Sequence, residues 1–394
     1  MSQITHARRP GIWVLTTASE SSYVLHVGAH GMLRCLHWGR ALTVEQAASL
    51  LEYPAPRERS CEDPQDGLLD LAAAGGLRYG YAGLQVRFAD GTRDLELEYL
   101  GHRVEGGELA LLFADVHFPL EIEACYRVRP DSPAIERHLT LRHTGEPGTE
   151  PIDVERADAA TWLLPELADY WLSRSYGQWS AENRVHRGQL TFGETVLGSR
   201  RGVTSHQANP WAMIDDGTAS EEHGTVYGAA LAWSGSWQLV AQRTPGNRVG
   251  LSLGHGHTPS IRSLEPGDEL RSPVSIGIHT EGGFGAAYRL GDPDRDTSGV
   301  QYVSRDGTET VVLAYRTARR FGAAAQVLPL RGLDTRARYR DPDTGREHHG
   351  AVLQARGVPL DLPAGDPAST LVRLRRVGTS TQAQLIPNGV NQQP

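Results

Sequence analysis

The stretch that decides the fold is LQVRFADGTRDLELEYLGHRVEGGELALLF, residues 84–113. Apolar residues take every second place in residues 84–88 and again in residues 95–99, and polar residues lie between them. The dipeptide Asp90-Gly91 separates the two runs and is a strong turn signal. The pattern predicts a β-hairpin with one buried and one solvent-facing side.

The same alternation continues on both sides of this stretch. It occurs in SYVLHVGAHGMLRCLHWG, residues 22–39, and in LEIEACYRVRPDSPAIERHLTLRHTG, residues 120–145. Short strands at a spacing of about ten residues are typical of a large antiparallel sandwich. Helical pattern is scarce, the main example being TVEQAASLL at residues 43–51, where Thr43 can cap the helix. The strand–helix alternation of a (β/α)8 barrel is absent from the sequence.

A second unit begins near Val300. Residues 300–316, VQYVSRDGTETVVLAYR, predict a hairpin around Asp306-Gly307, and further strand-like runs follow it. We therefore expect an all-β chain without a (β/α)8 barrel. Its parts are a large antiparallel β supersandwich at 1–289, a linker at 290–299, a small C-terminal β sandwich at 300–377 and a disordered tail at 378–394.

The composition limits the partners and the chemistry. The 39 basic residues are all Arg, and 47 acidic residues give a net charge of -8, which argues against a nucleic acid or an anionic membrane as partner. Without Lys there is no lysine nucleophile, Schiff base or P-loop. No apolar run reaches the roughly 18 residues of a membrane-spanning helix. We therefore expect a cytoplasmic protein.

Metal and cofactor motifs are also absent from the sequence. The three cysteines lie far apart without CxxC spacing, which predicts neither a zinc site nor a disulfide framework. His255 and His257 have no carboxylate or further His at a ligand spacing. We expect no cofactor and no metal.

Two passages resemble family 36 α-galactosidases. RRGVTSHQANPWAMID at residues 200–215 and GTVYGAALAWSGSWQLVAQ at residues 224–242 are similar to segments of that family's N-terminal supersandwich. Residues 289–316 and 328–340 are similar to its C-terminal β domain. In that family a catalytic barrel of about 250 residues lies between the two domains.

The resemblance implies that this barrel is missing. The C-terminal part resumes directly after Leu290, which leaves no room for it. The family's nucleophile lies in a Lys-Trp-Asp motif, whereas this chain has no Lys and none of its eight Trp precedes an Asp. We therefore expect no catalytic residues, and a chain of flanking domains that is inactive on α-galactosides by itself.

The candidate contact residues lie mostly around the first passage. They are Trp179, Arg201, His206, Asn209 and Trp211. One interpretation is a sugar-facing surface, on which Trp211 stacks on a pyranose ring and the polar groups bind hydroxyls. The other is a loop that docks the barrel. Trp233 and Trp237 have the same two interpretations, core packing or a carbohydrate platform.

A further candidate is Arg78. The family often has a Gly-Asp-Phe-Arg segment whose polar residues reach a neighbouring subunit's active site. The corresponding stretch here is GGLRYGYAGLQV, residues 75–86, in which Arg78 supplies the comparable charge and the Asp is not matched.

Two other functions remain open at this stage. The chain could be a carbohydrate-binding or assembly module that binds galactosides, forms a homo-oligomer or associates with a barrel-containing relative. It could also be an aldose-1-epimerase-like enzyme, in which His206 acts with Glu182 or Glu194.

Overall fold

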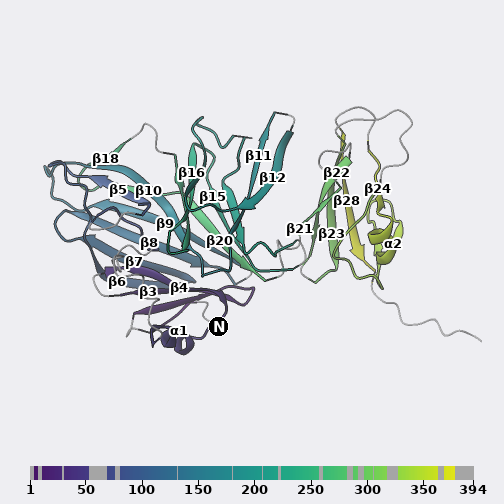
Figure 1. Ribbon diagram of the computed structural model, residues 1–394, viewed down its shortest axis with the longest axis horizontal. Coiled ribbons are helices and arrows are strands. Elements are labelled where there is room, and N and C mark those ends of the chain that lie inside the picture. Colours follow the sequence, from purple (N-terminus) through teal and green to yellow (C-terminus); the bar gives the residue numbers. More distant parts are fainter. Residues whose placement is uncertain are drawn as a thin grey trace, which may run out of the picture. The chain divides into compact units, whose positions relative to one another are not determined.

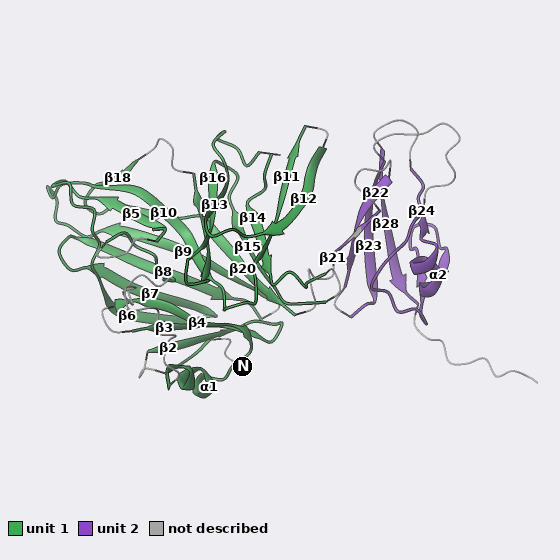
Figure 2. Ribbon diagram, in the orientation of Figure 1, with its two compact units in different colours: residues 1–283 green, residues 284–394 purple. Residues whose placement is uncertain are grey.

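The computed structural model describes residues 4–7, 11–28, 31–52, 69–75, 80–130, 132–179, 181–205, 207–220, 223–256, 261–281, 287–291, 297–304, 306–316, 327–362 and 368–377. The chain forms two compact units, 1–283 and 284–394 (Figure 2). Antiparallel β sheets make up most of each unit (Figure 1). The predicted all-β class is therefore confirmed.

The largest sheet of the first unit has ten strands. In spatial order they are β12 (Ala181–Gln189), β11 (Trp171–Gln178), β14 (Trp211–Asp215), β15 (Val226–Ala232), β20 (Val274–Thr280), β9 (Ala134–His143), β8 (Leu120–Val128), β7 (Glu108–Asp115) and β6 (Leu97–Glu105), with β19 (Glu269–Arg271) also paired to β9. Neighbouring strands run antiparallel, so hairpins and short connections join most of them.

Two smaller sheets complete the first unit. A six-stranded sheet holds β13 (Gly193–Ser199), β16 (Trp237–Arg243), β17 (Val249–His255), β10 (Ile152–Leu163) and β18 (Arg262–Leu264), with β5 (Leu84–Arg87) paired to β10. A four-stranded sheet holds β1 (Ile4–Ala7), β2 (Ile12–Thr16), β3 (Ser21–Val27) and β4 (Leu33–Arg40). After β4 come the short helix α1 (Val44–Ser49), capped as predicted by Thr43, and the 3-10 turn η2 (Leu50–Glu52).

The core of the first unit holds large aromatic side chains and one buried ion pair. Trp38 and Trp162 are both at most 2% exposed, and their ring centroids are 5.4 Å apart. Beside them Arg137 Nη1 lies 2.7 Å from Asp70 Oδ1, and both side chains are at most 1% exposed. Tyr23 also donates to Asp70. Burial raises the pKa of Asp70 while Arg137 opposes the rise, so the pair is held at a desolvation cost.

The predicted hairpin at residues 84–99 is wrong in its pairing. The turn forms, since Phe88 N donates to Thr92 O at 2.9 Å. However, β5 pairs with β10 in the six-stranded sheet, whereas β6 pairs with β7 in the ten-stranded sheet. Leu95 N donates to Ala74 O at 2.9 Å, so a segment from earlier in the chain binds the backbone directly after the turn and leads it into the other sheet.

The second unit is built around a six-stranded sheet. In spatial order its strands are β21 (Ala287–Leu290), β22 (Thr297–Val303), β23 (Glu309–Arg316), β28 (Ala368–Arg376), β25 (Arg338–Arg340) and β26 (Glu347–His349). A two-stranded sheet of β24 (Val327–Leu328) and β27 (Val358–Pro359), together with helix α2 (Gly350–Ala355), completes the unit. The hairpin around Asp306 is confirmed, because β22 and β23 are antiparallel neighbours.

Two details concern the predicted boundaries. The sequence assigned residues 287–289 to the first unit, whereas the structure pairs β21 with β22 of the second. The tail at 378–394 lies outside the described residues.

The helices of the described segments fall short of the length and hydropathy that a membrane-spanning helix requires.

Candidate binding surface

Three of the predicted contact residues, Trp179, Asn209 and Trp211, lie at or next to the β11–β12 hairpin. Tyr176 of this hairpin forms an isolated antiparallel bridge with Ala208. Next to it, Asn209 Nδ2 donates to Asn183 Oδ1 at 2.6 Å. These bonds fix residues 207–209 against the hairpin and bring the two asparagine amides together at one end of the ten-stranded sheet.

The preceding part of the same loop is held by the turn between β15 and β16. Thr204 N donates to Ser234 O at 2.9 Å, and Thr204 O accepts from Trp237 Nε1 at 2.9 Å. Gly202 N donates to Ser236 Oγ at 2.8 Å. The loop therefore bridges the ten-stranded and six-stranded sheets, and these bonds pair part of its backbone.

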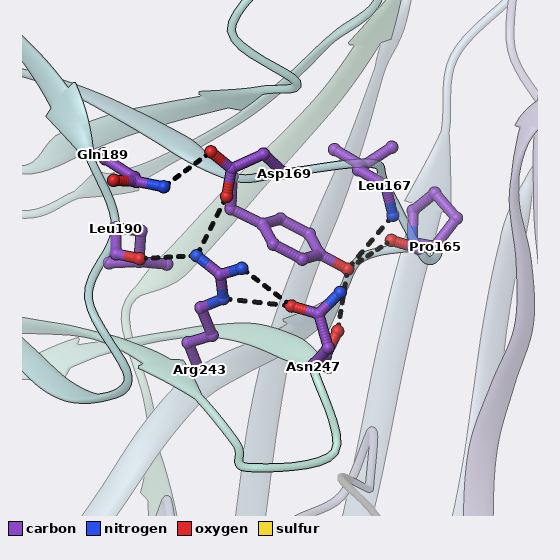
Figure 3. A network of polar contacts seen from close by, with 8 residues as sticks. Pro165, Leu167, Asp169, Gln189, Leu190, Arg243 and Asn247 are labelled. Carbon is purple, nitrogen blue, oxygen red and sulfur yellow. Dashed lines mark hydrogen bonds and ion pairs between the residues drawn. The ribbon is translucent and has the colours of Figure 1, made fainter.

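A polar network around the buried Arg243 fixes the base of the hairpin (Figure 3). Arg243, 8% exposed, donates through Nη1 to Asp169 Oδ1 at 3.1 Å and to Leu190 O at 2.8 Å. Its Nε and Nη2 donate to Asn247 Oδ1 at 3.0 and 2.8 Å. Gln189 Nε2 reaches the other oxygen of Asp169 at 2.8 Å. This arginine therefore ties the end of β12 to the end of β16.

Tyr170 closes the same network (Figure 3). Its hydroxyl lies 3.1 Å from both Pro165 O and Asn247 O and accepts from Leu167 N at 3.2 Å. Burial raises the pKa of this phenol. The backbone N–H of Tyr170, with smaller contributions from Gln189 and Arg243, holds the pKa of Asp169 below its usual value. Asp169 is thus kept ionised as the acceptor at the hairpin base.

The outer face of β12, β11 and β14 carries a second ion pair. Because Leu172 and Ile214 point into the core, their neighbours Trp171 and Asp215 point to the opposite face. Arg187 Nε donates to Asp215 Oδ2 at 3.0 Å, and its guanidinium lies over the Trp171 ring, 5.4 Å from the centroid. The side chain of Asp215 is fully buried, whereas that of Arg187 is 29% exposed.

Two serines lie on the same outer face. Ser173 and Ser175 of β11 are only 1% and 2% exposed. Neither hydroxyl has a hydrogen-bond partner among the residues that the structure describes. No signal in the sequence marks these serines, since serine in an alternating strand normally indicates a solvent-facing position. Arg187 and Asp215 were also missed as a pair, because their contact depends on the pairing of β12, β11 and β14.

The predicted contact residues differ in their surroundings. Trp179, at the tip of the hairpin, is 80% exposed, and Trp211 begins β14 half-buried on the outer face. Arg201 is exposed near the start of the loop. Of the two other tryptophans, Trp237 packs in the core and Trp233 is 44% exposed. Arg78 and His206 lie outside the described residues.

Both epimerase pairs include His206, which lies outside the described residues. Glu182 lies on β12 of the ten-stranded sheet and Glu194 on β13 of the six-stranded sheet. Within the described segments, no three His, Cys, Asp or Glu side chains gather in a way that could hold a metal ion. Cys35 and Cys125 are free thiols, and Cys61 lies outside those segments.

Comparisons with known proteins agree with the fold. The model of the glycosyl hydrolase family 36 N-terminal domain matches residues 31–262, and that of the family 36 C-terminal domain matches residues 297–374. α-Galactosidase Mel36A of Lactobacillus acidophilus is 25% identical over 294 residues, which cover 67% of this chain and 39% of the relative. α-Galactosidase AgaA of Geobacillus stearothermophilus is 24% identical over 293 residues, covering 68% and 40%. The chain thus spans about two fifths of the length of these relatives.

Solved structures show the same fold at low identity. The galactosidase domain of the α-galactosidase–sucrose kinase AgaSK superposes with a TM-score of 0.76 at 13% identity, over 95% of this chain and 100% of that chain. The α-galactosidase of Lactobacillus brevis gives 0.76 at 12% identity, over 97% and 100%.

The two matched domains lie almost next to each other in the sequence. Only residues 263–296 separate them, and the described part of that segment includes strands β19, β20 and β21. The chain belongs to glycosyl hydrolase family 36, of which it has the N-terminal and C-terminal domains and lacks the catalytic barrel region.

Proposed function

We propose that this chain does not hydrolyse α-galactosides by itself and instead acts as a binding or assembly module. The observation that carries the proposal is the short spacing of the two family domains, since residues 263–296 cannot hold a barrel of about 250 residues. Retaining glycosidases need two carboxylates about 5 Å apart on a rigid scaffold. In this family the barrel supplies them.

The test is an assay of the purified chain with p-nitrophenyl α-galactoside. We expect release of nitrophenol at the rate of the protein-free blank. An intact family 36 α-galactosidase, assayed in the same buffer at equal concentration, is the positive control. Sustained turnover that follows the chain through size-exclusion chromatography would overturn the proposal.

A binding or assembly role is favoured by the exposed aromatic groups near the hairpin. Trp179 is 80% exposed, and large aromatic side chains with neighbouring amides are typical of surfaces that contact a ligand or a partner. Galactosides are the first ligands to test, because the curated relatives are α-galactosidases.

For an assembly role, the partner to test is a second copy of the chain or a barrel-containing relative. Sedimentation of the chain alone and mixed with such a relative measures this, and unchanged monomer in both samples would contradict assembly.

A further inference from the structure

We propose that the outer face of β11, β12 and β14 binds a neutral sugar ring, whose hydroxyls pair with Ser173 and Ser175. This inference rests on the proposed binding function and gives it a location. It differs from the surface expected from the sequence, because its centre is the two serines of β11.

The strand register places each serine between larger side chains. Ser173 is paired with Arg187 of β12 and with Met213 of β14. Ser175 is paired with Val185 of β12. Side chains alternate between faces along a strand, so Trp211, two residues before Met213 in β14, points to the same face as Met213. The two hydroxyls therefore lie in a row of short side chains, with longer side chains on both sides.

The hydroxyls themselves point to a missing partner. Each is buried, and neither bonds to a described residue. A buried hydroxyl without a partner is destabilising, and an alanine would fill the same place without that cost. A partner that brings its own hydroxyl groups would satisfy both serines.

The surroundings favour a neutral ring over an anion. Arg187, the cation beside Ser173, is already paired with the buried carboxylate of Asp215, so the two charges compensate each other. Trp211 offers an aromatic surface, and the bonded amides of Asn209 and Asn183 lie at the same end of the sheet. A sugar ring combines apolar C–H faces with hydroxyls and matches this combination of groups.

Entry of the ring beside Ser173 would displace Met213. Met213 is partly exposed and lies beside Ser173. Methionine is unbranched and adapts its shape easily, so its displacement can open the row of serines without moving the sheet.

The experiment is a titration of the full chain with methyl α-D-galactopyranoside, followed by the indole N–H signals in ¹H–¹⁵N NMR spectra. We expect saturable binding that shifts the Trp211 signal. Ser173→Ala and Ser175→Ala should each weaken binding about threefold to tenfold, as expected for the loss of one hydrogen bond. Trp211→Ala should weaken it at least as much.

Two controls separate lost binding from lost folding. The serine variants should unfold at the wild-type temperature or above it, because each removes an unpaired buried hydroxyl. Trp233→Ala removes a partly exposed tryptophan of the turn between β15 and β16 and should leave the affinity unchanged. Methyl α-D-glucopyranoside, tested in parallel, shows whether the face distinguishes the two sugars.

The outcomes distinguish this inference from the proposed function. Saturable binding that survives all three substitutions, or that is lost in Trp233→Ala instead, overturns this location but leaves a binding role intact. No saturable binding of either sugar overturns both this inference and the sugar-binding role, whereas the nitrophenyl assay decides separately whether the chain hydrolyses.

Discussion

The two halves of the ten-stranded sheet have different outer faces. Over β6–β9 the face carries exposed ion pairs, such as Arg103–Glu123 at 3.1 Å and Arg142–Glu269 at 2.8 Å. The strands β11 and β12 lie at the other end of the sheet from β6 and β7 (Figure 1). The outer face of β11, β12 and β14 carries Trp171, the two serines and the Arg187–Asp215 pair.

The difference shows which half of the sheet has an outer face suited to contact with water. Exposed ion pairs contribute little to stability, about 0–1 kcal/mol, but keep a strand face soluble and discourage pairing with other proteins. A buried carboxylate, aromatic rings and unpaired hydroxyls make a poor solvent face. The alternation of core and outer residues is the same in both halves, so the composition of the outer positions makes the difference.

The largest expected effect comes from removing the buried acceptor. Asp215→Ala should lower the free energy of unfolding by about 2–3 kcal/mol, because Arg187 is left without its carboxylate in a largely desolvated position. Asp215 also accepts from Gly217 N at 2.7 Å, which adds to the loss. Urea denaturation followed by tryptophan fluorescence measures the change.

The matched control is Asp216→Ala, which removes the same charge one position along the chain. Asp216 accepts from the adjacent turn, from Thr218 N at 2.9 Å and Thr218 Oγ1 at 2.6 Å. Its loss should cost under about 1 kcal/mol, as for an exposed turn bond. An equal loss of unfolding free energy in the two variants would show that the Arg187–Asp215 pair contributes no more to stability than an exposed turn.

A smaller, pH-dependent effect is expected in the charged half. Burial, assisted by Arg271 and Arg127, lowers the pKa of His138 from 6.5 to about 4, and Glu108 and Glu136 only partly oppose this fall. Between these two values the unfolded chain binds a proton that the folded chain does not. Stability is therefore fully present above about pH 6.5 and is lost as the pH falls toward 4.

His138→Gln should flatten this slope, because the variant has no group to titrate there. Unfolding midpoints of both proteins in urea at pH 4.5, 5.5 and 7 (about one unit apart) check the prediction. A His138 ring that titrates near 6.5 in NMR spectra of the folded chain would contradict it.

The sequence could predict a strand pairing or a contact only where the interacting residues lie close together along the chain. The hairpin around Asp306 was predicted correctly because turn and partner strands are local. The pairing at residues 84–99 was wrong because the partner of β5 is β10, far along the chain. Family membership came from the motif at residues 200–215. The burial of Ser173 was beyond sequence reasoning, since it depends on what β12 and β14 place on either side.

The smallest effect should come from an exposed ion pair of the charged half. Arg127 pairs with Glu108, and their side chains are 48% and 51% exposed. Glu108→Ala should change the free energy of unfolding by no more than about 0.5 kcal/mol, because water and salt screen the attraction. The difference should vanish in about 1 M NaCl, where the screening length is roughly 3 Å. A loss above about 1 kcal/mol would mean that the charged half is also shielded from water, and the contrast between the two halves would not hold.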